Sequence, residues 1–169
     1  MAEPLFDIPA GYDPEAVEAS MAAVRAFCGW HIAPVISEDL ILDSHGGYLL
    51  MLPTLKLVSV DAFTINGEAV LDAEWSQAGI IKNATPSLGW WEHSFRSVAI
   101  SITHGYETCP AEIRSVVLGV ARSGLTSSRV VSQTTGPFSV TYAQGASAPF
   151  GIGLYETAIL SRYRLPASL

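Results

Sequence analysis

Asp43, Ser44 and His45 have the residue types of a hydrolase catalytic triad. The members of a triad must converge from separate segments of a fold, and three consecutive residues cannot supply that geometry. All three are good turn formers, and Gly46 and Gly47 follow them. We therefore interpret this stretch as a β-hairpin turn and not as an active site.

Histidines and cysteines are the other candidates for metal binding or acid–base chemistry. The histidines are His31, His45, His93 and His104. No two of them stand at the helical spacing of three or four residues that makes a metal site persuasive. Cys28 and Cys109 lie in no CxxC or zinc-type pattern, so we expect two buried thiols in a reduced compartment and no bound metal.

Glycines gather near the C-terminus, at Gly145, Gly151 and Gly153. A phosphate-binding loop would need a following Gly-Lys-Ser/Thr motif or a strand that leads into a helix with dinucleotide-binding spacing, and the sequence has neither. Residues 144–153 are small and rich in breakers, which predicts a flexible hinge. Because nucleophile, metal set and cofactor loop are all missing from the sequence pattern, we expect a protein that has no cofactor and is not an enzyme.

Three segments show helical signals. Residues 13–29 begin with a capping aspartate and a proline, and they carry apolar residues at spacings of three and four. Residues 109–124 repeat this pattern and are expected to end at their final glycine. A short third helix is expected within residues 154–163. Residues 1–12 contain two prolines and a glycine, which predicts an extended arm before the first helix.

Short apolar runs between residues 36 and 106 predict an antiparallel β-module. Leu40–Leu42 and Tyr48–Leu52 flank the turn described above. Asn66-Gly67 is the strongest short turn dipeptide and follows a run rich in β-branched residues. Every second residue from Val98 to Ile102 is a large apolar one, which is the period of a half-buried strand.

The order of these elements is helix, β-module, helix, hairpin, helix, with the hairpin at residues 129–143. We therefore expect an α+β fold in which the N-terminal, middle and C-terminal helices form a small bundle with an inserted antiparallel β-module. A single domain would span residues 1–169. The helices are too few and too short to build a sizeable core without the sheet or a neighbouring subunit.

The composition is apolar and acidic. Hydrophobic residues make up 49% of the 169 residues, charged residues only 15%, and the formal net charge is −7. A chain this apolar either has a large core or covers part of its surface with other subunits. The basic residues are scattered, which argues against tight binding to nucleic acid. The acidic N-terminal stretch does not resemble a signal peptide, and we expect neither membrane insertion nor export.

Large aromatic side chains fit two interpretations. The tryptophans are Trp30, Trp75, Trp90 and Trp91. They could anchor the core of the sheet, or some could lie at subunit contacts, where tryptophan is enriched. We take Trp90, Trp91 and the hairpin residue Phe138 as candidate subunit contacts.

The C-terminal segment, residues 154–169, mixes aromatic, aliphatic and basic side chains behind the expected hinge. Its candidate contact residues are Leu154, Tyr155, Ile159, Arg162, Tyr163, Arg164 and Leu165. The segment could pack on the core of its own chain. It could instead dock its apolar face into the groove of a partner.

Several stretches, taken in order, resemble the head-to-tail adaptor (connector) proteins of long-tailed bacteriophages, especially siphophages that infect actinobacteria. The most telling stretches are the strand-to-helix junction Thr103–Ile113 and the hairpin Gln133–Tyr142. Weaker similarity lies in the sequences Ala26–Pro34, Leu52–Val60 and Leu160–Pro166. None of these stretches is a chemical motif, so the resemblance rests on the series.

The resemblance implies a structural virion protein that forms a dodecameric ring in the neck, between the portal protein and the stopper or tail protein. DNA would pass through the lumen without specific binding. The protein would be made in the host cytoplasm and end in the virion. By the same resemblance the C-terminal segment would engage the portal, and deleting Leu154–Leu169 would abolish that binding while leaving the fold intact.

Other functions remain open on the sequence. Another neck ring, such as a stopper or tail-completion protein, is an alternative within the same kind of particle. A monomeric β-rich ligand-binding accessory protein is a second alternative. An enzyme that uses His104 or the region of Asp43 and His45 is the least favoured.

Overall fold

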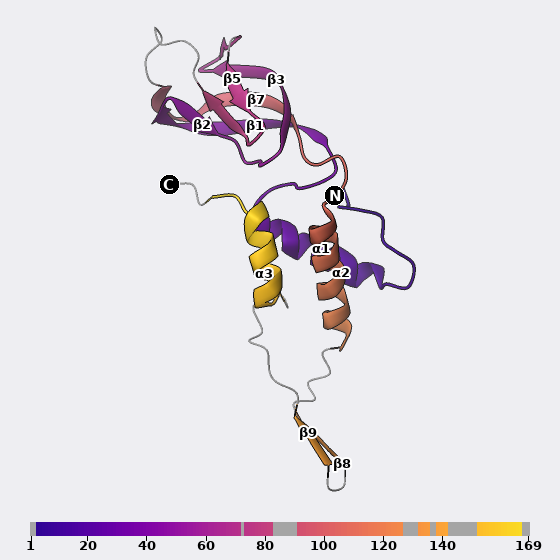
Figure 1. Ribbon diagram of the computed structural model, residues 1–169. Coiled ribbons are helices and arrows are strands. Elements are labelled where there is room, and N and C mark those ends of the chain that lie inside the picture. Colours follow the sequence, from indigo (N-terminus) through magenta and orange to yellow (C-terminus); the bar gives the residue numbers. More distant parts are fainter. Residues whose placement is uncertain are drawn as a thin grey trace. The chain divides into compact units, whose positions relative to one another are not determined.

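The computed structural model describes residues 3–71, 73–82, 91–126, 132–135, 138–141 and 152–166, and within these ranges only the backbone of residues 45, 91–93, 124–126, 132–135 and 138–141. The predicted α+β fold is confirmed (Figure 1). The chain forms two compact units. The helical unit consists of Met1–Cys28 and Pro110–Arg164, and the β-unit consists of Gly29–Cys109 and Leu165–Leu169.

The helical unit contains the helices that the sequence predicts. They are α1 (Pro14–Cys28), α2 (Ala111–Thr126), α3 (Leu154–Leu160) and the 3₁₀ turn η3 (Ser161–Tyr163). At the start of α1, the Asp13 carboxylate accepts a hydrogen bond from the Glu15 amide at 3.3 Å, as expected for a capping residue. Helix α2 runs to Thr126, so the expectation that Gly124 would end it is wrong.

Apolar residues from all three helices form the core of this unit. The fully or nearly fully buried ones are Leu5, Val17, Met21, Val24, Cys28, Ile113, Val116, Val117, Val120, Ala121, Ile152 and Leu160. Leu5 belongs to the stretch that the sequence predicts as an extended arm. The guanidinium groups of Arg114 and Arg122 lie 5.2 and 4.8 Å from the ring centroids of Phe6 and Tyr12. Residues 3–12 therefore pack on the helices and form part of the helical unit.

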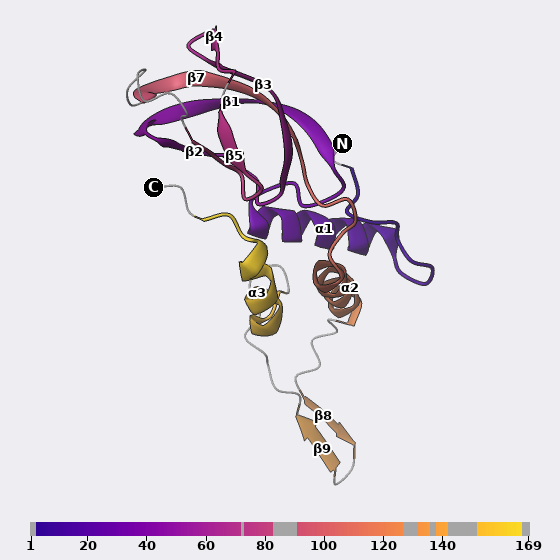
Figure 2. The same cartoon turned by 45° about the horizontal axis from the view of Figure 1, so that its top comes forward.

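The β-unit contains two antiparallel sheets (Figure 2). The first has the order β1 (Ile36–Gly47), β7 (Trp91–His104), β3 (Leu57–Ile65), β4 (Glu68–Ala69). The second has the order β2 (Leu49–Met51), β6 (Ile80–Lys82), β5 (Glu74–Ser76). Their shared core consists of Leu50, Leu52, Leu57, Phe63, Ile81, Val98, Ile100 and Ile102.

The expected hairpin turn at Asp43–Gly47 is wrong. Strand β1 continues to Gly47 and pairs with β7, with a register shift between Leu42 and Ser44. The Asp43 carboxylate accepts a hydrogen bond from the Arg96 amide of β7 at 2.6 Å. A local turn signal is overridden here because a long strand from much later in the chain satisfies the backbone of β1.

Two other local predictions are confirmed. Asn66 and Gly67 have φ angles of 53° and 84° and join Ile65 of β3 to Glu68 of β4, which is the geometry of a two-residue type I′ turn. In β7, Val98 and Ile102 are fully buried while Ala99 between them is exposed. The period of two therefore marks the inner face of the first sheet.

The later hairpin is a sheet of its own. Strands β8 (Ser132–Thr135) and β9 (Phe138–Thr141) pair antiparallel, from Ser132 opposite Thr141 to Thr135 opposite Phe138. Of the predicted hinge at residues 144–153, residues 144–151 lie outside the described part of the chain.

Replacing Gly79 by alanine should destabilise the β-unit by about 3 kcal/mol or more. Gly79 has a φ of +76°, and a Cβ atom there would lie 2.2 Å from the carbonyl oxygen of the buried Thr54. Gly119→Ala is the matched control, because a Cβ on this α2 residue meets nothing within 4 Å. In urea unfolding, the free energy of unfolding of the control should be unchanged or up to about 1 kcal/mol higher. Equal midpoints for the two variants would contradict the clash.

Candidate partner-binding surface

Two pairs of histidines come together in the described residues: His31 with His104, and His45 opposite His93 across strands β1 and β7. His104 is buried, and its Nε2 lies 3.2 Å from an Oε2 of Glu38. The His31 ring lies 6.0 Å away between ring centroids, and its Nε2 is 2.8 Å from the carbonyl oxygen of Pro34. No group of three or more metal-binding side chains occurs among these residues. The side chains of His45 and His93 lie outside the described set.

Burial sets the protonation of His104. Loss of hydration lowers its pKa below the ordinary value of 6.5, although the hydrogen bond and the charge of Glu38 act in the opposite direction. Its Nδ1 has no hydrogen-bond partner in the described part of the chain. His104 is thus a neutral, buried residue at the end of β7.

The free energy of unfolding should decrease as the pH is lowered because of His104. The unfolded chain takes up a proton on His104 below about pH 6.5, whereas the folded chain resists it. Stability is therefore complete above that pH and is lost as the pH falls toward the lower pKa of the folded chain. Urea midpoints measured from about pH 7.5 to pH 5 should decline less steeply in His104→Gln than in the parent chain. An equal or steeper decline in the variant would contradict this assignment.

The two cysteines differ in their surroundings. Cys28 is fully buried, and its Sγ lies 4.0 Å from the carbonyl oxygen of Leu160. Burial raises the pKa of its thiol to about 11, against the lowering effect of the Arg164 charge. Cys109 is only half-buried, where the sequence predicted burial. The raised pKa keeps the Cys28 thiol protonated and unreactive near neutral pH.

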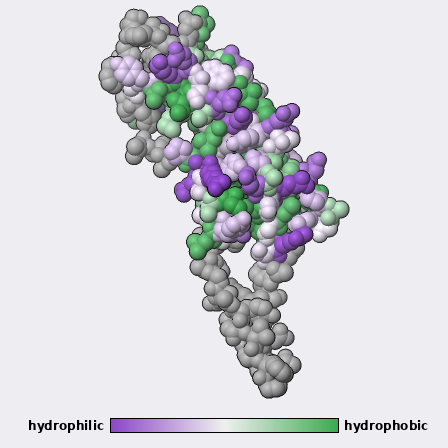
Figure 3. Space-filling model, in the orientation of Figure 1, coloured by the Kyte–Doolittle hydropathy of each residue, from purple (hydrophilic) through white to green (hydrophobic). Residues whose placement is uncertain are grey.

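The exposed apolar residues of α3 are better candidates for contact with a partner. Leu154 and Tyr155 are 86% and 75% exposed, on consecutive positions at the start of the helix. The Arg162 side chain is also exposed, in the 3₁₀ turn η3 that follows α3. Elsewhere the visible face of the molecule mixes apolar and polar residues (Figure 3).

The remaining predicted contact residues are already engaged within the chain. The Tyr163 hydroxyl donates a hydrogen bond to an Oε2 of Glu112 at 2.5 Å. The Arg164 guanidinium lies over the Phe27 ring at 5.3 Å. Ile159 and Leu165 are half-buried. The segment therefore packs on the core and also presents an exposed apolar pair, so the two interpretations of the sequence apply to different residues.

The aromatic candidates fall in different environments. Trp30 is buried, with its ring centroid 6.0 Å from that of Tyr106, and Trp75 is 41% exposed. Trp90 lies outside the described residues. Trp91 opens β7 opposite Gly47, and Phe138 opens β9 opposite Thr135, but their side chains are outside the described set.

None of the helices in the described ranges is both long and apolar enough to cross a membrane. No protein-family model matches the chain, and no curated protein matches it either.

Similarity to solved structures extends over the whole chain. A chain in the neck of a native GTA particle, computed with C12 symmetry, superposes with a TM-score of 0.56 at 15% identity, over 100% of this chain and 97% of that one. A chain in the neck of an empty GTA particle, computed with C6 symmetry, gives 0.54 at 17% identity, over 98% and 86%. A chain of the virion of a native gene transfer agent (GTA) particle gives 0.55 at 16% identity, over 92% and 77%. At these identities the similarity establishes a shared fold.

Proposed function

We propose that the protein is a structural subunit of a ring in the neck of a tailed, phage-like particle. The observation that carries the proposal is the fold shared along 100% of the chain with a protein of a particle neck computed with C12 symmetry. Fold alone does not determine function, but the described residues also contain no group of three or more metal-binding side chains. A structural role agrees with this chemistry.

Within the neck, we assign the chain to the head-to-tail adaptor, as a single adaptor domain in a ring of twelve copies. The sequence resemblance to siphophage adaptors supports this choice over a stopper or tail-completion protein. Along the chain, helix α1 precedes the β-module and helices α2 and α3 follow it, as that resemblance implies. A net charge of −7 suits a lumen through which DNA must slide without being held.

The portal is the proposed partner of the exposed residues at the start of α3. Leu154 and Tyr155 are large, apolar and solvent-exposed in the single chain. A ring subunit carries such surfaces because the faces that contact its neighbours become buried only on assembly. Arg162 adds a positive charge to an otherwise acidic chain and could pair with a carboxylate of the partner.

The native mass of the purified protein tests the proposal, first alone and then mixed with portal rings. We expect a mass near twelve chains, either alone or on the portal. A chain that stays at 18.0 kDa in both settings would contradict the ring, and would favour a monomeric ligand-binding accessory protein. A ring that binds a tail protein but no portal would favour the stopper alternative.

A further inference from the structure

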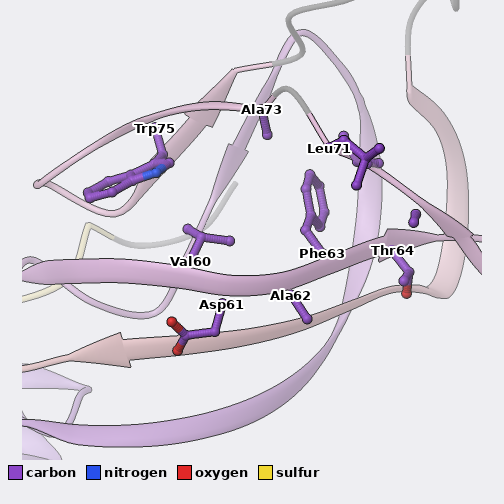
Figure 4. Close-up of a pocket in the computed structure, with 10 residues that line it drawn as sticks. Val60, Asp61, Ala62, Phe63, Thr64, Leu71, Ala73 and Trp75 are labelled. Atoms are coloured by element: carbon purple, nitrogen blue, oxygen red, sulfur yellow. The ribbon is translucent and has the colours of Figure 1, made fainter.

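A pocket of about 370 Å³ opens along one edge of β3. Val60 and Phe63 point into it from below, and Trp75 and Ala73 lie on the other side (Figure 4). Leu71 stands at its rim and is 90% exposed. The pocket is mostly apolar, with Asp61 and Thr64 as the polar members of its lining, and its floor is a β-strand.

The middle of this edge has no backbone partner in the described part of the chain. Its two ends are bonded, because the Leu57 amide donates to the Gln77 carbonyl oxygen and the Val70 amide donates to the Phe63 carbonyl oxygen. One side of β3 pairs with β7 along most of its length. The other side pairs with β4 only at Thr64 and Ile65, so Val58–Ala62 has no strand partner on that side in the described part of the chain. An open edge next to an apolar pocket is a template for an added strand, which would satisfy the backbone and fill the pocket with alternate side chains.

The hairpin formed by β8 and β9 is a candidate for the added strand. It is a sheet of two strands with four residues each, and such a ribbon is at best marginally stable without a surface to cover it. The sequence of residues 132–141 has no charged residue, and Phe138 and Val140 alternate with Ser139 and Thr141 in β9. This is the pattern of a strand with one apolar face.

Charge argues against the other long edge as the occupant. Strand β1 also has a free side, since β7 is its only strand partner among the described residues. It carries Glu38 and Asp39, and the free edge of β3 carries Asp61. Like charges across paired strands are destabilising. The uncharged β9 meets no such penalty.

We propose that β9 of one copy adds to the free edge of β3 in the next copy, with its apolar side chains in the pocket under Trp75. The proposal rests on the ring assigned above and supplies its subunit contact. Each copy offers one hairpin and one pocket, so the contact is heterologous and propagates from copy to copy until the ring closes. It also gives a role to Phe138, which the sequence marked as a candidate subunit contact.

Cross-linking tests the contact in the full chain. The variant carries Ala62→Cys and Ser139→Cys, with Cys109→Ser to remove the half-buried native thiol, and is treated with a short bis-maleimide that tolerates small errors of register. Denaturing gels should show a ladder that extends well beyond two linked chains. Each single-cysteine variant should give no ladder. Products that stop at two chains would overturn head-to-tail addition.

A second variant separates this contact from the ring itself. Phe138→Asp should lower the fraction of chains in rings by roughly tenfold or more, because it places a charge in an apolar pocket. Ile41→Asp is the matched control on β1, where the side chain is 58% exposed, and should assemble normally. Two results would overturn the hairpin contact and leave the neck function standing. One is intact rings of the double-cysteine variant that give no cross-links. The other is a Phe138→Asp variant that assembles like the Ile41→Asp control. A parent chain that never forms rings overturns both the hairpin contact and the neck function.

Discussion

Replacing Leu154 and Tyr155 together by aspartate should weaken binding to the portal by about 100-fold or more, with the stability of the chain unchanged. Exposed apolar anchors that become buried in an interface are commonly worth about 2 kcal/mol each, and a charge at such a position adds a desolvation cost. The free chain should lose little, since the two side chains are 86% and 75% exposed. Acidic residues in the first turn of α3 also face the positive end of its dipole.

Binding can be measured by co-sedimentation with portal rings over a range of concentrations. The matched control is the double variant Leu49→Asp and Met51→Asp, which places charges on β2 residues that are 57% and 58% exposed. We expect the control to retain affinity within a few fold. Full affinity in the α3 variant would show that the portal docks elsewhere. Equal losses in both variants would point to a nonspecific effect of added negative charge.

Leu160→Ala should lower the free energy of unfolding of the helical unit by about 2–5 kcal/mol, the usual cost of emptying a buried leucine site. Leu160 is fully buried at the end of α3, and its carbonyl oxygen faces the Cys28 thiol of α1. Urea unfolding followed by far-UV circular dichroism measures the loss. Leu154→Ala on the same helix is the control and should stay within about 0.5 kcal/mol of the parent chain. Equal midpoints would mean that α3 is not part of the helical core.

The buried Leu160 also changes how the C-terminal segment can be tested. Deletion of residues 154–169 was expected to leave the fold intact, but it would remove Leu160 from the core together with the Tyr163 hydrogen bond to Glu112. A truncated chain that fails to bind could simply have lost its helical unit. Point substitutions at the exposed positions avoid this ambiguity.

Much of the fold is predictable because its signals are local. The apolar stripe and capping aspartate of α1, the type I′ turn at Asn66-Gly67 and the alternation in β7 all depend on neighbouring residues. The partner of β1 is not a local property. Nothing near Asp43–Gly47 indicates that Ser44 will lie opposite Ser94, so the local sequence predicts a turn where the structure has a strand.

The sequence predicts which segment carries the candidate surface. It does not predict which residues of that segment are exposed. The sequence of the C-terminal segment shows which side chains are large or charged, but Leu154 and Leu160 look alike in it. Only packing against α1 and α2 makes one of them 86% exposed and the other fully buried. The pairing of His31 with His104 was missed for the same reason, since 6.0 Å in space corresponds to no recognisable spacing in the sequence.

The order of segments along the chain has a consequence for how the protein folds as it is synthesised. The β-unit is encoded by one nearly continuous stretch, Gly29–Cys109, whereas α1 belongs to a unit whose other helices come after it. On the ribosome, β1 must wait unpaired until β7 emerges, and long-range pairing of this kind is slow and exposes strand edges to aggregation. Helix α1 waits longer still, because α3 supplies the last piece of its core. Cotranslational folding should therefore proceed from the middle of the chain outward, with the helical unit completed last.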